Sequence, residues 1–312
     1  MLFTANPDIS LHESQHIFLR SCEDMPILPG TVSLTITSPP YWNLKSYGSS
    51  TDEIGHENYD RYLERMNAVW DECFKSSKEN SVLAININSR RSKGVFYPIA
   101  FNIAQNMKNW KLWDTLIWYI PNALPQPNHY MHRLFDNKFE YVLIFVKGDP
   151  LKHVFHKPRV AQKYLNADPR AEKKNPMGRC LGNIVRIPAY RPPNIKSMGY
   201  HVAAFPEELV ALLMETYTDV GDVVLDPFLG SGTTLKVARH LGRTGVGFEV
   251  NSEFRGLIEK RINEGWKRPP WTEIDIIHST TSTTGRSTPR KSQFRDENIQ
   301  DRLQSNLFPR KE

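Results

Sequence analysis

The chain has 312 residues, enough for one large domain or for one domain with an insert. No apolar run approaches the ~20 residues of a membrane-spanning helix, and the first residues lack the charge and apolar core of a secretory signal. The three cysteines include no Cys-x-x-Cys pair, which is typical of a reducing compartment and unfavourable for zinc. We therefore expect a cytoplasmic protein that binds neither a membrane nor a metal.

The first strong pattern in chain order is a strand that ends in two prolines. Residues 32–36 form an apolar run typical of a buried strand, and Pro39 and Pro40 end it because proline has no N–H for the ladder. The step offers acceptors and a ring: Ser38 Oγ and the Pro39 carbonyl can accept both protons of an exocyclic amine, while Tyr41 stacks on the base that carries it. A strand-ending turn with an aromatic plug is the alternative.

After this step, helical and strand patterns alternate. Apolar and aromatic residues at helical spacing predict helices over residues 58–76 and 96–107. Short apolar runs predict strands at 82–87, 113–120 and 139–146. A proline-rich linker joins the last two strands, so we expect them to form a hairpin.

Residues 148–200 have a different composition. They contain 11 lysines and arginines and 3 acids, a net charge of +8 that exceeds the +6 of the whole chain. Their periodicity is poor, and a segment of this length without periodicity inside a domain is typically functional or disordered. We predict that this basic insert recognises nucleic acid, chiefly through phosphate contacts. A solvated loop is the simpler alternative.

Regular patterns return after residue 200. A helix is predicted near Pro206, which is followed by two acids, and a strand covers residues 223–226. The turn after that strand contains Gly230 and Gly232, which allow a ligand to approach the backbone closely. The next helix begins at Thr233, and its first N–H groups can bind a carboxylate.

Two acids stand near the ends of neighbouring strands in this half. Asp226 can either order the glycine turn or accept a hydrogen bond from a ligand ammonium group. Glu249, near the end of a strand at 246–250, lies where a carboxylate binds ribose hydroxyls in dinucleotide folds, and a structural glutamate is the alternative. A helix at 252–264 ends the regular pattern, and the polar composition of residues 278–312 predicts a disordered tail.

Two of these segments together resemble the S-adenosylmethionine (SAM)-dependent DNA amino-methyltransferases. Ser38-Pro39-Pro40-Tyr41 is similar to the family's catalytic motif in the form typical of cytosine-N4 enzymes, and Asp226-Pro227-Phe228-Leu229-Gly230-Ser231-Gly232-Thr233 is similar to its cofactor motif. The catalytic motif comes first, which is the order of the family's β group. The resemblance covers about residues 15–265. It implies an α/β, Rossmann-like fold: a doubly wound, mostly parallel sheet with a terminal hairpin and a smaller inserted DNA-recognition region.

The resemblance also divides the chain and implies binding residues. Residues 15–147 become the catalytic half of the methyltransferase domain, 148–200 the target-recognition insert and 201–265 the SAM-binding half. The implied SAM contacts are Phe205, Asp226, Pro227, Phe228, Gly230, Ser231, Gly232, Thr233 and Glu249. The expected contacts with double-stranded DNA are Lys45, Arg133, Arg159, Arg179 and Arg191. The family often has Gly-Asp where this chain has Arg20-Ser21-Cys22, so an acidic contact with the cofactor adenine is not expected.

The implied reaction moves a methyl group from SAM to the N4 amine of a flipped-out cytosine, and it would protect host DNA from a cognate restriction endonuclease. Adenine-N6 enzymes share the amine geometry but usually have Asp in place of Ser38, and they remain the alternative. A non-catalytic DNA-binding protein of the same fold is a further alternative. Carbon-5 methylation requires a thiol within Pro-Cys, and no cysteine here follows a proline.

Overall fold

The computed structural model describes residues 2–42, 53–125, 132–160, 179–189 and 206–266. The expected tail at 278–312 lies outside these residues. Within the described ranges, no helix combines the length and the apolar character needed to cross a bilayer. The same ranges contain no group of three or more His, Cys, Asp or Glu side chains placed to hold a metal ion.

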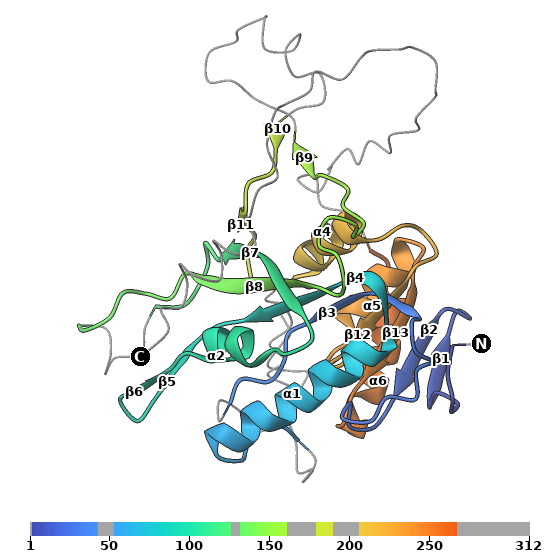
Figure 1. The fold of residues 1–312 in the computed structure, drawn as a ribbon, viewed down its shortest axis with the longest axis horizontal. Helices are drawn as coiled ribbons and strands as arrows, with labels where there is room; N and C mark the ends of the chain where they lie inside the picture. The colour runs from blue at the N-terminus through green and yellow to red at the C-terminus, as the bar shows by residue number, and fades with distance from the viewer. Residues whose placement is uncertain (1, 43–52, 126–131, 161–178, 190–205, 267–312) are drawn as a thin grey trace, which may run out of the picture. The chain divides into compact units, whose positions relative to one another are not determined.

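A nine-stranded sheet forms the centre of the described structure (Figure 1). Its strands, in spatial order, are β1 (Ile9–Leu11), β2 (Gln15–Phe18), β13 (Thr244–Phe248), β12 (Val223–Asp226), β3 (Val32–Thr37), β4 (Ser77–Ile87), β8 (Phe139–Val146), β7 (Lys111–Tyr119) and β11 (Ile184–Arg186). The five strands from β2 to β4 are mutually parallel, and β8 and β7 form an antiparallel hairpin beside them. The expected doubly wound, mostly parallel sheet with a hairpin is confirmed.

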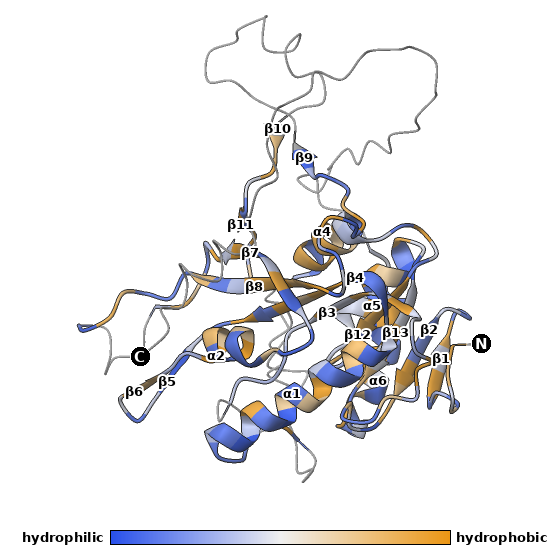
Figure 2. Ribbon diagram, in the orientation of Figure 1, coloured by the Kyte–Doolittle hydropathy of each residue, from blue (hydrophilic) through white to orange (hydrophobic). Residues whose placement is uncertain are grey.

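Helices cover both faces of this sheet. The helices α1 (Tyr59–Ser76) and α2 (Ile99–Asn106) pack on one face, and α4 (Glu207–Tyr217), α5 (Thr233–His240) and α6 (Arg255–Asn263) pack on the other. The helix α1 begins where the Asn58 side chain accepts a hydrogen bond from the Arg61 N–H, an ordinary N-cap. Figure 2 shows apolar residues recurring along α1, as expected for a helix with one buried face.

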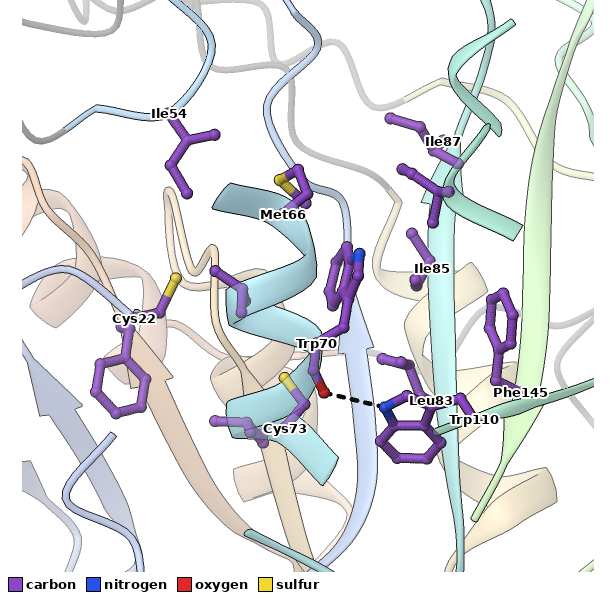
Figure 3. Close-up of a cluster of buried hydrophobic side chains, with 14 of the residues drawn as sticks. Cys22, Ile54, Met66, Trp70, Cys73, Leu83, Ile85, Ile87, Trp110 and Phe145 are labelled. Atoms are coloured by element: carbon purple, nitrogen blue, oxygen red, sulfur yellow. Dashed lines mark hydrogen bonds between the residues drawn. The ribbon is translucent and has the colours of Figure 1, made fainter. Parts of the chain in front are cut away.

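The core beneath α1 combines aliphatic, sulfur-containing and aromatic side chains (Figure 3). Met66, Trp70 and Cys73 of the helix belong to the same buried cluster as Leu83 and Ile85 of β4. The Trp110 indole N–H donates to the Trp70 carbonyl at 3.0 Å, so a buried hydrogen bond joins α1 to the segment that precedes β7. This core holds the parallel strands at their relative heights, and it therefore sets where their carboxyl ends lie.

Several boundaries differ from the sequence predictions. The helix expected from residue 96 begins at Ile99, because Val95–Tyr97 (β6) pairs instead with Arg90–Ser92 (β5) in a small hairpin. The strand expected at 82–87 starts earlier, at Ser77, and the strand expected at 246–250 ends at Phe248. Glu249 is thus the first residue after its strand, where its side chain is not constrained by the pleat.

The described part of the predicted insert contributes to the main sheet as well as to a small ribbon. The strands β9 (Arg159–Val160) and β10 (Arg179–Cys180) pair with each other, whereas β11 pairs with β7. Val185 and Ile187 are buried in the same cluster as α4. A segment assigned to recognition on composition therefore also supplies an edge strand and core residues.

Candidate active site

The two motifs meet at the point where the sheet changes winding direction. The strands β3 and β12 are parallel neighbours, but β3 continues into α1 on one face and β12 continues into α5 on the other. In open α/β sheets, ligands bind beyond the carboxyl ends of the strands at such a switch point. The Thr37 hydroxyl donates to Asp226 Oδ1 at 2.8 Å, which joins the ends of strands whose residues lie 189 positions apart.

Asp226 is the centre of the turn between β12 and α5. Its carboxyl is buried and accepts hydrogen bonds from the Thr37 hydroxyl, the Thr234 hydroxyl at 2.5 Å and the Phe228 N–H at 3.1 Å. Burial raises the pKa of Asp226 to about 6, and the three hydrogen bonds act against that shift by favouring the charged form. Of the two roles open to Asp226 in the sequence, these contacts support the ordering of the turn.

The turn itself depends on two glycines. Gly230 and Gly232 have φ values of +53° and +90°, a region that other residues rarely adopt. A Cβ on Gly232 would also lie 3.4 Å from the Ile258 side chain, so the turn packs closely on α6. Gly232 ends the turn, and α5 starts at Thr233.

The start of α5 fits the carboxylate group of SAM. The Thr233 hydroxyl is buried and has no hydrogen-bond partner among the described residues. A buried hydroxyl without a partner is unfavourable, and it is satisfied when a ligand acceptor reaches it. The first N–H groups of the helix lie at the same place and favour an anion. Ser231 is buried next to it, and Pro227 is buried on the other side of the turn.

Glu249 closes the other side of the glycine turn. Its Oε2 accepts from the Gly230 N–H at 2.9 Å and its Oε1 accepts from the Asn251 N–H at 2.8 Å. Burial raises the pKa of Glu249 to about 7. Each carboxylate oxygen can accept a further hydrogen bond, so the group fits a pair of ribose hydroxyls while it still orders the turn.

Binding of SAM is expected to become stronger with rising pH because of Glu249. Ribose hydroxyls favour the carboxylate over the neutral acid, so the pKa of Glu249 falls in the complex and a proton is released. With a free pKa of about 7, the ionised fraction increases roughly tenfold between pH 6 and pH 8, and the affinity should increase by about the same factor. Calorimetry at several pH values measures this slope. Glu249→Gln should flatten it, and an unchanged slope in that variant would contradict the assignment.

Phe228 and Tyr41 lie on the same hydrophobic cluster, at the ends of neighbouring strands. The Phe228 ring contacts Trp70 edge to face, with ring centroids 6.2 Å apart, and both Phe228 and Tyr41 pack against the core under α1. Each of the two residues is half-buried. Phe205, the other expected wall of the SAM site, lies outside the described residues.

The segment Ser38-Pro39-Pro40-Tyr41, called the catalytic step because it resembles the family's catalytic motif, keeps two hydrogen-bond acceptors available. The Pro40 carbonyl accepts from the Tyr62 hydroxyl at 3.0 Å, whereas no described residue donates to the Pro39 carbonyl. Ser38 is half-buried, and its Oγ receives a long hydrogen bond, 3.4 Å, from Asn86 Nδ2. A hydroxyl oxygen accepts two hydrogen bonds, so Ser38 can still accept from an amine.

Two residues behind this step were missed in the sequence. Asn86 of β4 donates from the same Nδ2 to Glu140 Oε2 at 2.7 Å, and its Oδ1 is buried without a hydrogen-bond partner in the described structure. The Glu140 carboxyl of β8 is buried beside the Tyr41 hydroxyl, and burial raises the pKa of both groups. Asn86 and Glu140 were each a single polar residue within an apolar strand pattern, and that was the available signal.

The structure describes only some of the residues expected to contact DNA. Arg133 is exposed, and Arg159 is half-buried on β9. Arg179 belongs to β10, but its side chain is not described, and Lys45 and Arg191 lie outside the described residues. Their roles stay predictions.

Comparison with known proteins places the chain among DNA methylases. Residues 32–260 match the family model described as DNA methylase. The chain is 28% identical over 276 residues to the type II methyltransferase M.MjaI of Methanocaldococcus jannaschii, covering 76% of this chain and 87% of that protein. It is 29% identical over 252 residues to the orphan methyltransferase M.BamHII of Bacillus amyloliquefaciens, covering 74% and 89%.

Solved structures share the fold. The PvuII DNA methyltransferase, described as cytosine-N4-specific, superimposes with a TM-score of 0.64 at 20% identity, over 84% of this chain and 91% of that chain. TTHA0409 of Thermus thermophilus, a putative DNA modification methylase solved with SAM, gives a TM-score of 0.53 at 24% identity, over 79% and 92%. With a family match across both motifs and the sheet between them, the chain belongs to the DNA methylase family of SAM-dependent amino-methyltransferases.

Proposed function

We propose that this DNA methyltransferase acts on the N4 amine of cytosine in double-stranded DNA. The proposal rests on the hydrogen bond between Thr37 and Asp226 at the switch point. Ser38 and Pro39, with their acceptors, follow Thr37 directly, and the glycine turn follows Asp226. This one hydrogen bond therefore joins the two motifs. When bound, SAM supplies a methyl group that is already activated on its sulfonium. The chain has to supply binding, orientation and a suitable electrostatic environment for the amine.

The acceptors at the step prepare the target amine. The lone pair of an aryl amine is delocalised into the ring, which makes the nitrogen a poor nucleophile. Hydrogen bonds from the amine to Ser38 Oγ and to the Pro39 carbonyl favour a more tetrahedral nitrogen with a localised lone pair. The same two oxygens stabilise the positive charge that develops on this nitrogen, and they are already in place before the reaction.

The surrounding residues hold the step and the base. Tyr62 and the core fix the Pro-Pro segment, and Asn86 orients Ser38 through the 3.4 Å contact. Extracting a base from the duplex costs a few kcal/mol. Stacking on the Tyr41 ring offsets part of that cost, on the order of 1–3 kcal/mol. The basic insert at 148–200 supplies contacts with phosphates. Arg159 belongs to the described part of this insert, and Arg133 precedes the insert in the chain.

The choice of cytosine rests on Ser38. Adenine-N6 enzymes resemble this chain but usually have an Asp at this position, whereas a neutral hydroxyl is typical of the cytosine-N4 form of the motif. Several relatives are named type II methyltransferases. A role in protecting host DNA at a short sequence from a cognate nuclease, in the cytoplasm, follows from that likeness.

The identity of the methylated base tests the proposal. The protein is incubated with unmethylated genomic DNA and isotopically labelled SAM, and the DNA is digested to nucleosides for mass spectrometry. We expect labelled N4-methylcytosine, and a Ser38→Ala reaction run in parallel as the control should yield little product. Labelled N6-methyladenine would overturn the assignment to cytosine, and the absence of any labelled base would overturn the assignment to DNA.

A further inference from the structure

The β5–β6 hairpin is a basic and aromatic projection that the proposed reaction leaves unexplained. It follows the carboxyl end of β4, the strand next to the catalytic step, and Figure 1 shows it extending beyond the main sheet. Residues 88–98 contain Arg90, Arg91 and Lys93 and no acid. Val95 and Phe96 are 53% and 48% exposed.

The two faces of the hairpin differ in what they contact. Arg90 pairs with Tyr97, and both face the catalytic step: the Arg90 guanidinium donates to the Trp42 carbonyl at 2.6 Å, and the Tyr97 and Trp42 ring centroids are 4.4 Å apart. Paired residues share a face and neighbours along a strand alternate, so Arg91 and Phe96 lie on the opposite face. The inner face therefore braces the residue after Tyr41, and the outer face meets solvent.

The outer face carries a preorganised cation. The Arg91 guanidinium lies over the Phe96 ring, 5.0 Å from its centroid, a cation–π contact that restricts the long side chain. In the described part of the chain, neither Arg91 nor Lys93 forms an ion pair with a carboxylate. Two cations that pair with no carboxylate of the described residues, one of them held over an aromatic ring, complement a polyanion.

The tip of the hairpin places a lysine where the backbone disfavours it. Lys93 and Gly94 have φ values of +48° and +82°, which is the two-residue turn that Asn-Gly forms best. A lysine at the first of these positions costs conformational free energy that an asparagine would avoid. The chain thus has a positive charge at the outermost turn in place of the residue that would stabilise the turn.

We propose that the outer face of this hairpin, formed by Arg91, Lys93 and Phe96, binds the DNA backbone beside the flipped-out base. This contact rests on the proposed action on DNA, and it is separate from the insert at 148–200. Arg91 and Lys93 bind phosphates, and Phe96 keeps the Arg91 guanidinium oriented. Because the inner face contacts Trp42, the hairpin also ties the position of the bound backbone to the catalytic step.

The test measures duplex DNA affinity of the full chain at several salt concentrations by fluorescence anisotropy. Removal of two phosphate contacts lowers the slope of log Kd against log salt concentration by about 1.8 and weakens binding roughly 10- to 100-fold near 0.1 M salt. We expect this for the double variant Arg91→Ala with Lys93→Ala. The matched control, Lys108→Ala with Lys260→Ala, removes two exposed lysines, one just after α2 and one in the last turn of α6, and should change neither value.

A second variant separates DNA binding from folding. Lys93→Asn should raise the melting temperature, since Asn-Gly suits this turn. It should also lower the DNA affinity and the salt slope by about the amounts expected for the loss of one phosphate contact. If the Arg91, Lys93 double variant and Lys93→Asn bind DNA as the control does, the hairpin proposal is overturned. If the unaltered protein itself neither binds nor methylates DNA, the proposed function fails instead, so the two failures are distinguishable.

Discussion

Replacement of Ser38 by alanine is expected to lower kcat by about 100- to 1,000-fold, the usual loss when one preorganised hydrogen-bonding group is removed from a developing charge. Among the described residues, Ser38 receives only the long 3.4 Å contact from Asn86, so its replacement leaves the contacts of Asp226, the glycine turn and Glu249 intact. The Kd for SAM should therefore change less than about twofold. Single-turnover methylation and calorimetry measure the two quantities.

The control for Ser38→Ala lies on the same strand. Ser33 Oγ donates to Asp222 at 2.6 Å near the other end of β3, away from the catalytic step. Ser33→Ala should affect stability without a selective effect on kcat. If Ser38→Ala weakens SAM binding as much as it slows methylation, Ser38 is a structural residue of the turn and the role assigned to it is wrong.

Replacement of Asp226 by alanine is expected to weaken SAM binding by about 10- to 100-fold. Asp226 accepts from the Phe228 N–H and the Thr234 hydroxyl, which lie on the two sides of the glycine turn. Each hydrogen bond to a charged group contributes about 1.5–3 kcal/mol, and 1.4 kcal/mol corresponds to a tenfold change in affinity. The donors left without a partner also lower the free energy of unfolding, by about 1–3 kcal/mol. Calorimetry and urea unfolding measure these changes.

Asp226→Asn distinguishes the shape of this side chain from its charge. The amide keeps an acceptor for Phe228 or Thr37 but loses the charge whose burial raises the pKa of Asp226 to about 6. We expect intermediate SAM affinity and a smaller loss of stability than in the alanine variant. Wild-type affinity in Asp226→Ala would show that the turn is ordered without the carboxylate.

Local patterns predicted most of the elements correctly because their causes are local. The apolar stripe of α1 and the two-proline end of β3 were visible as spacing and as missing N–H groups. The glycine turn after β12 followed from Gly230 and Gly232, which the structure has at positive φ. Helix boundaries were less certain: residues 95–97 have apolar side chains that suit either a helix or a strand, and their pairing with Arg90–Ser92 decided the outcome.

The environment of the site was beyond the reach of pattern and spacing. Asn86 and Glu140 lie 54 residues apart on antiparallel strands, and only the register of β4 with β8 brings them together behind Ser38 and Tyr41. The burial that raises the pKa values of Asp226 and Glu249 also depends on distant segments that exclude water.

The amino-acid sequence by itself determined the chemical groups of this protein: the acceptors of Ser38 and Pro39, the Tyr41 ring, the glycine turn and its two acids. It did so because proline, glycine and strand periodicity act within a few residues. Only the tertiary structure decided that Thr37 and Asp226 share a hydrogen bond and that the β5–β6 hairpin rests on Trp42. Those contacts join segments far apart in the chain, and their geometry is set by the packing of strands and helices in the core, which no local pattern encodes.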